Sequence, residues 1–135
     1  MKTSLHDMFQ TDSNKETKGV KLEYGTVSVW IARAGGKNKA FAKALEKETK
    51  PFRRQIMNNT MPDKTSNAIL RRVYAKHIVL NWEGVVDQDG NPIPCTEENI
   101  IKVFEELPDF FIDIQEQSRN IALFQDEEIE EAAKN

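Results

Sequence analysis

The span from Trp82 to Phe124 constrains the fold of this chain more than any other part of its sequence. It places a tight polar turn, two spaced prolines and two helix-start signals one after another with almost no linker. Thr96 is a strong N-cap candidate, because two glutamates follow it in the first turn, where the helix dipole favours anions. Asp109 is expected to cap the next helix. The span therefore predicts helices near residues 97–106 and 109–124.

The polar turn has the sequence Asp-Gln-Asp-Gly-Asn at residues 87–91. Clusters of Asp, Asn and Gly are typical of tight turns. The same residues also suggest a calcium-binding loop of the EF-hand type. If Gly90 took the sixth position of such a loop, Val85 would be first and Thr96 twelfth, and neither supplies the required carboxylate. We therefore expect a turn and no calcium site.

Two apolar segments nearer the N-terminus alternate with polar residues at a period of two, over residues 20–24 and 27–31. This period predicts β-strands, and Gly25 between them predicts a small antiparallel hairpin. A lone hairpin is marginally stable in water, so it must lie on helices or pair with another chain.

Apolar residues at helical spacing predict further helices near residues 38–48 and 66–82, with a shorter one at 49–57 between them. Asn38 can cap the first, and Gly84 is expected to end the longest. The longest helix places one apolar set at helical spacing: Ile69, Leu70, Val73, Tyr74, His77, Ile78 and Leu80.

These elements predict a mostly helical α+β fold, with a small N-terminal β-hairpin followed by a compact bundle of about four to five helices. At 135 residues the chain has the size of one domain. We expect a flexible arm at 1–18, a single globular domain at 19–124 and an acidic tail at 125–135. The arm carries one apolar cluster, which is expected to dock on the body: Leu5, Met8 and Phe9.

Charge is distributed unevenly along the chain, although the formal net charge is only -3. Residues 33–54 hold eight basic and two acidic side chains, whereas residues 97–135 hold twelve acidic and three basic ones. Such polarity can order subunits head to tail, and solvated helix faces produce similar counts, so both interpretations stay open.

No chemically reactive arrangement of residues is evident. Cys95 and His77 lack the surroundings of a cysteine hydrolase, and no Cys/His pair has metal-ligand spacing. Gly35-Gly36-Lys37 lacks the remainder of a phosphate-loop motif. The basic segment 33–54 could contact nucleic acid, but the pI of about 5.5 and the lack of a known nucleic-acid motif argue against this. We expect no catalytic, cofactor or metal site.

No apolar run approaches the roughly 18 residues of a membrane span, and no signal peptide is evident.

Several short segments follow one another in a recognisable order: Met8–Asp12, Ile31–Phe41, Lys50–Ile56, Tyr74–Val85, Asp89–Pro94, Glu106–Phe111 and Asn120–Phe124. In order and spacing they resemble the tail assembly chaperones of long-tailed bacteriophages, the group related in role to the lambda and HK97 tail chaperones. Cys95 departs from the pattern, because a bulkier apolar residue is expected at its position.

The resemblance implies a non-enzymatic protein of the host cell cytoplasm that is not in the mature virion. It implies binding to the tape-measure protein, which is kept soluble while tail-tube protein subunits assemble around it. Self-association would add avidity. Two alternatives remain: a structural tail or head-completion protein retained in the virion, and a small nucleic-acid-binding regulator.

A chaperone for a long helical partner needs apolar grooves or helix faces. Six aromatic residues are candidates for either partner contact or core: Trp30, Phe41, Phe52, Trp82, Phe110 and Phe111.

Overall fold

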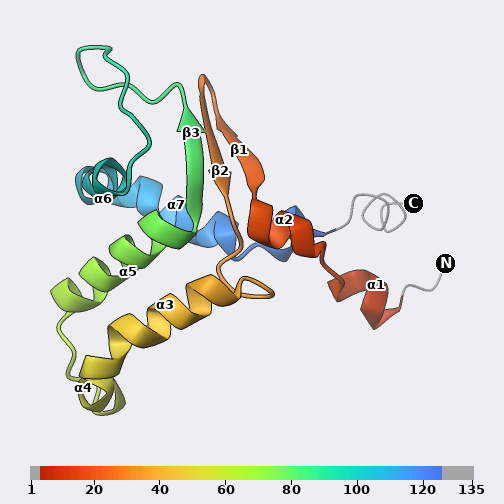
Figure 1. The fold of residues 1–135 in the computed structure, drawn as a ribbon, viewed down its shortest axis with the longest axis vertical. Helices are drawn as coiled ribbons and strands as arrows, with labels where there is room; N and C mark the ends of the chain where they lie inside the picture. The colour runs from red at the N-terminus through yellow and green to blue at the C-terminus, as the bar shows by residue number, and fades with distance from the viewer. Residues whose placement is uncertain (1–3, 126–135) are drawn as a thin grey trace.

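A computed structural model describes residues 4–125, which form a three-stranded sheet with helices packed beside it (Figure 1). The predicted fold class is confirmed, because a small N-terminal hairpin precedes the helices α3 to α7 in a mostly helical α+β chain. The predicted tail lies outside the described residues except for Gln125. The elements are α1 Leu5–Phe9, α2 Ser13–Lys18, β1 Val20–Tyr24, β2 Val27–Ile31, α3 Lys39–Thr49, η1 Lys50–Phe52, α4 Arg53–Met57, α5 Asp63–His77, β3 Val79–Glu83, α6 Glu97–Glu106, α7 Pro108–Ser118 and η2 Ile121–Phe124.

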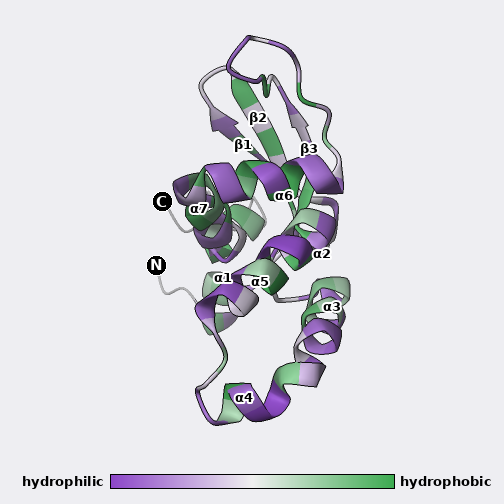
Figure 2. Ribbon diagram, turned by 90° about the vertical axis from the view of Figure 1, so that its left-hand side faces the viewer, coloured by the Kyte–Doolittle hydropathy of each residue, from purple (hydrophilic) through white to green (hydrophobic). Residues whose placement is uncertain are grey.

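Strands β1 and β2 form the predicted hairpin. Tyr24 pairs with Val27, so Gly25 and Thr26 make the turn. Leu22, Val29 and Ile31 are buried. Figure 2 shows the strands at one end of the molecule and α4 at the other.

The predicted helix at 66–82 is wrong in its last turn. Helix α5 ends at His77, and residues Val79–Glu83 form β3, which pairs antiparallel with β2. Gly84 therefore ends a strand and not a helix. The third strand places β2 in the centre of the sheet, where both of its edges are paired.

A β-bulge explains why this strand has a helical pattern in the sequence. Ile31 pairs with Val79 whereas Trp30 pairs with Asn81, so the register shifts at Leu80. A bulge moves the following residues to the opposite face of the sheet. Val79 and Trp82 are consequently both buried at a spacing of three, while Leu80 is 42% exposed.

The caps predicted for α3 and α6 are confirmed. The Asn38 side chain accepts a hydrogen bond from the amide of Phe41, and the Thr96 hydroxyl accepts one from the amide of Asn99. The short helix predicted over 49–57 is present as η1 followed by α4.

The predicted helix at 109–124 differs at both ends. It begins at Pro108, whose missing N–H is tolerated in the first turn, and Asp109 makes no capping hydrogen bond. It ends at Ser118. The Asn120 side chain then accepts a hydrogen bond from Ala122 and begins the separate 3-10 helix η2.

Helices α1 and α2 form the N-terminal arm. The expectation that its apolar cluster docks on the body is wrong, because Leu5, Met8 and Phe9 are 73%, 47% and 61% exposed. Helix α2 instead attaches through Glu16, which is fully buried.

Buried Glu16 connects α2 to the loop after β2. Its carboxylate accepts hydrogen bonds from Arg33 Nη1 and from the Lys37 amide, each at 2.7 Å. Burial favours the neutral acid, but hydrogen bonds from Thr11, Lys37 and Arg33 outweigh it and hold the pKa of Glu16 below its ordinary value. The carboxyl group is therefore charged at neutral pH.

We predict that Glu16 makes the free energy of unfolding depend on pH in the acid range. Because its pKa is lowered in the folded state, its contribution is present above the unfolded pKa of 4.5 and is lost as pH falls through the folded value. Glu16→Gln should lower the free energy of unfolding at neutral pH by about 1.5–3 kcal/mol and reduce the loss in acid. Urea unfolding across pH measures both effects. Glu23→Gln on the surface is the control, and an equal response of the two variants would contradict the prediction.

We also predict a large effect at Trp82, which is 6% exposed and donates from Nε1 to the Ile93 carbonyl at 2.8 Å. Trp82→Ala should lower the free energy of unfolding by about 3–5 kcal/mol. Trp82→Phe keeps a smaller aromatic ring but leaves that carbonyl without its donor, and should lower the free energy of unfolding by about 1–2 kcal/mol. Chemical denaturation measures both. A free energy of unfolding for Trp82→Ala near that of the parent would contradict the prediction.

Candidate partner-binding surface

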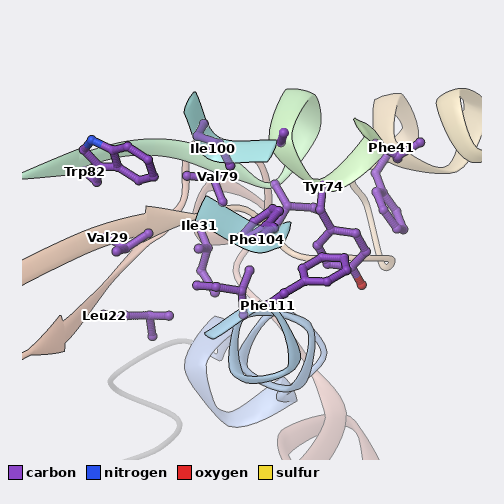
Figure 3. Packing of buried hydrophobic residues seen from close by; sticks show 14 of the residues in the cluster. Leu22, Val29, Ile31, Phe41, Tyr74, Val79, Trp82, Ile100, Phe104 and Phe111 are labelled. Carbon is purple, nitrogen blue, oxygen red and sulfur yellow. The ribbon is translucent and has the colours of Figure 1, made fainter. Parts of the chain in front are cut away.

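Aromatic rings form a continuous series through the core. Figure 3 shows four of them, Phe41, Tyr74, Phe104 and Phe111, which come from α3, α5, α6 and α7. The centroid distances along the series are 5.4 Å for Phe41–Tyr74, 5.5 Å for Tyr74–Phe111, 4.5 Å for Phe111–Phe104, 5.9 Å for Phe104–Phe110 and 5.7 Å for Phe110–Tyr24. The last two rings are half-buried, so the series ends at the surface.

An apolar groove of about 320 Å³ opens at that end. It lies between the tip of the hairpin, the segment after β3 and the corner between α6 and α7. Two of its lining residues, Val86 and Leu107, are 51% and 56% exposed. Its principal lining residues are Tyr24, Val27, Trp82, Val86, Leu107 and Phe110.

Gly84 brings two walls of the groove together. It has φ of +79°, and a Cβ atom there would lie 2.4 Å from the Thr26 carbonyl oxygen. Only glycine permits this backbone conformation and this close approach without strain. The end of β3 can therefore lie directly against the hairpin turn.

Acidic residues neighbour the groove lining in the sequence, and one carboxylate binds a lining residue. Glu83, Glu106 and Asp109 are exposed and directly adjoin lining residues in the sequence. The Tyr24 hydroxyl donates to Asp113 Oδ2. Burial and then the Asp113 carboxylate raise the pKa of Tyr24, so the hydroxyl stays protonated at neutral pH. The groove thus combines an apolar surface with a lining hydroxyl that donates to a carboxylate.

The six predicted aromatic residues fall into two groups. Phe41, Trp82 and Phe111 are buried, whereas Trp30, Phe52 and Phe110 are half-buried. Trp82 and Phe110 line the apolar groove. Trp30 and Phe52 lie elsewhere. The Trp30 ring centroid is 5.5 Å from Lys21 Nζ, and Phe52 lines a second groove between α3 and α5.

Sequence reasoning missed Tyr24, Val86 and Leu107 as groove residues. Leu107 has a signal in the sequence, because a residue before proline is disfavoured in a helix and this one sits at a corner between two helices. Tyr24 and Val86 carry no comparable signal, since their positions depend on how the hairpin meets the segment after β3.

The residues considered for chemistry lie apart from this groove. His77 lines the second groove, and Cys95 packs against the core, where burial raises the pKa of its thiol. The predicted turn at 87–91 is confirmed, because Asp87 Oδ1 accepts hydrogen bonds from the amides of Asp89 and Asn91. Within residues 4–125 no group of three or more His, Cys, Asp or Glu side chains could hold a metal ion. None of the helices in that range is long and apolar enough to cross a membrane.

Residues 36–135 match the model of the family described as YdaY prophage protein. The chain belongs to this family. No curated protein and no solved structure gives a significant match. The family assignment supports the phage origin that the sequence resemblance implied.

The YdaY match begins after the hairpin, at Gly36. It includes Trp82 of β3, Leu107 at the corner between α6 and α7, and Phe110 of α7, which all line the groove. The hairpin, outside the matched region, supplies Tyr24 and the turn. The groove therefore joins the YdaY-family region to the segment before it.

We predict that the Tyr24–Asp113 hydrogen bond stabilises this junction. Tyr24→Phe and Asp113→Asn should each lower the free energy of unfolding by about 1 kcal/mol. The double variant should lose less than the sum, because both changes remove the same interaction. A double-mutant cycle by chemical denaturation measures this coupling, and strictly additive losses would contradict it.

Proposed function

We propose that this protein is a phage tail assembly chaperone that binds helical segments of the tape-measure protein in the apolar groove. In this role it keeps the tape-measure protein soluble and promotes assembly of the tail-tube protein around it. The main support is the groove itself, where the aromatic core reaches the surface beside exposed Val86 and Leu107. The prophage family supports a phage-related role, and the resemblance to tail chaperones suggests which role this is.

The chemistry of the groove suits an amphipathic helix. Such helices present apolar residues at spacings of three and four, which dock into hydrophobic grooves. A space of about 320 Å³ accommodates a few side chains, so each contact is weak and many copies along one long partner would bind by avidity.

The proposed role requires no catalysis, cofactor or metal. It places the protein in the host cell cytoplasm during assembly and leaves it out of the mature virion. The raised thiol pKa of Cys95 is consistent with a structural cysteine, because nucleophilic cysteines need an accessible thiolate.

Co-expression with the tape-measure protein encoded by the same phage tests the proposal. Leu107→Glu adds a carboxylate to the groove and should reduce the soluble fraction of the tape-measure protein several-fold. Ile112→Glu is the matched control, because Ile112 is 50% exposed, lies on α7 and does not line the groove. Both substitutions are at exposed positions and should leave the fold intact, which circular dichroism checks.

Two results would overturn this function. Equal aggregation of the tape-measure protein with and without the wild-type chain would remove the chaperone role. Detection of the chain in purified particles by mass spectrometry would favour the alternative of a structural tail or head-completion protein.

A further inference from the structure

A second groove, of about 630 Å³, lies mainly between α3 and α5 and is lined by four Lys and Arg side chains against two carboxylates, Glu48 and Glu97. Lys43 and Lys47 are one turn apart on α3, and Arg72 and Lys76 are one turn apart on α5. Two rows of cations therefore border the same groove. Its apolar lining comes from Ala40, Ala44, Phe52 and Val73.

Three of the four cations form no ion pair within residues 4–125, and the net charge of the lining is positive. Arg72 pairs with Glu48 at 3.1 Å, but no ion pair among residues 4–125 involves Lys43, Lys47 or Lys76. Like charges at a spacing of four destabilise a helix. A ligand that supplies several carboxylates would relieve this repulsion.

The chain itself contains a segment of matching chemistry. Residues 126–135 have the sequence Asp-Glu-Glu-Ile-Glu-Glu-Ala-Ala-Lys-Asn, with five carboxylates against one lysine. Ile129 sits among the carboxylates, and two alanines follow, so the segment also offers apolar groups to the groove lining. Ten residues span up to about 33–36 Å when extended, whereas the eleven residues of α3 span about 16 Å.

We propose that residues 126–135 of one copy bind the basic groove of a second copy. The described chain ends beside the N-terminal arm, where Gln125 accepts a hydrogen bond from Lys15 Nζ and donates one to the Met8 carbonyl. In Figure 1, α1 and α2 lie on the right, whereas α5 and the second half of α3 extend to the lower left. The segment therefore begins on the opposite side of the molecule from the second half of α3, which lines the groove, and this placement favours a neighbouring copy as its receptor. The proposal rests on charge and placement and does not depend on the tape-measure protein as partner.

Fluorescence anisotropy with a labelled peptide of residues 125–135 tests the site on the full-length protein. The Lys43→Glu/Lys47→Glu variant should bind this peptide about tenfold more weakly or worse, since two cations of the groove are reversed. The Lys39→Glu/Lys64→Glu variant makes the same charge change on α3 and α5 outside the groove and should bind like the wild type. Binding should weaken with salt. Equal affinity of both variants for the peptide, or no binding at all, would overturn the site.

Sedimentation velocity tests whether the receptor is a second copy. The wild type should form species larger than a monomer at low salt, and excess peptide should dissociate them. The Lys43→Glu/Lys47→Glu variant should remain monomeric. A monomeric wild type at high concentration would overturn the proposal even with peptide binding, because the segment would then occupy its own groove. Duplex DNA that binds through the same lysines while the peptide does not would overturn it in favour of nucleic acid.

Discussion

The pairing of β3 with β2 is the interaction on which the rest of the structure depends. Two strands alone are marginal in water, and the third gives the sheet a paired centre. Its bulge places both Val79 and Trp82 in the core. Trp82 then holds the segment after the strand through the Ile93 carbonyl, and Gly84 lets that segment approach the hairpin turn. The walls of the apolar groove are thus consequences of one strand pairing, and disruption of this ladder should disturb the fold and the groove together.

Local signals in the sequence were sufficient for most of the elements. Asn38 and Thr96 act as caps through short-range hydrogen bonds, and the period of two over the hairpin depends only on neighbouring residues. The third strand could not be predicted in this way, because a bulge gives its buried residues the spacing of a helix. Helix α2 was also missed, since its anchor Glu16 is a charged residue whose burial depends on Arg33 and Lys37, distant in the sequence.

The candidate surface could be predicted only in part for a related reason. Aromatic composition drew attention to Trp82 and Phe110, which do line the groove, but it also included Phe41 and Phe111, which are buried. Composition cannot separate groove residues from core residues, because Phe110 belongs with Phe41 and Phe111 to one series of neighbouring rings. Which ring reaches solvent is decided by where the hairpin turn meets the corner of α6 and α7. That meeting is a tertiary contact with no local sequence signal.

The loop at residues 35–37 binds the N-terminal arm through the Glu16 carboxylate. Gly36 has φ of +55°, and any Cβ there would lie 2.9 Å from the Glu16 carboxylate, so the loop closely surrounds this anion. The backbone amide and the Arg33 guanidinium bind the carboxylate much as a receptor binds a free ligand. Because Glu16 is tethered to its receptor, its effective concentration is high and outside anions compete poorly. The arm therefore behaves like a tethered ligand of the loop. Release of Glu16 from Arg33 and the Lys37 amide is a local equilibrium that can be separated from unfolding of the whole domain.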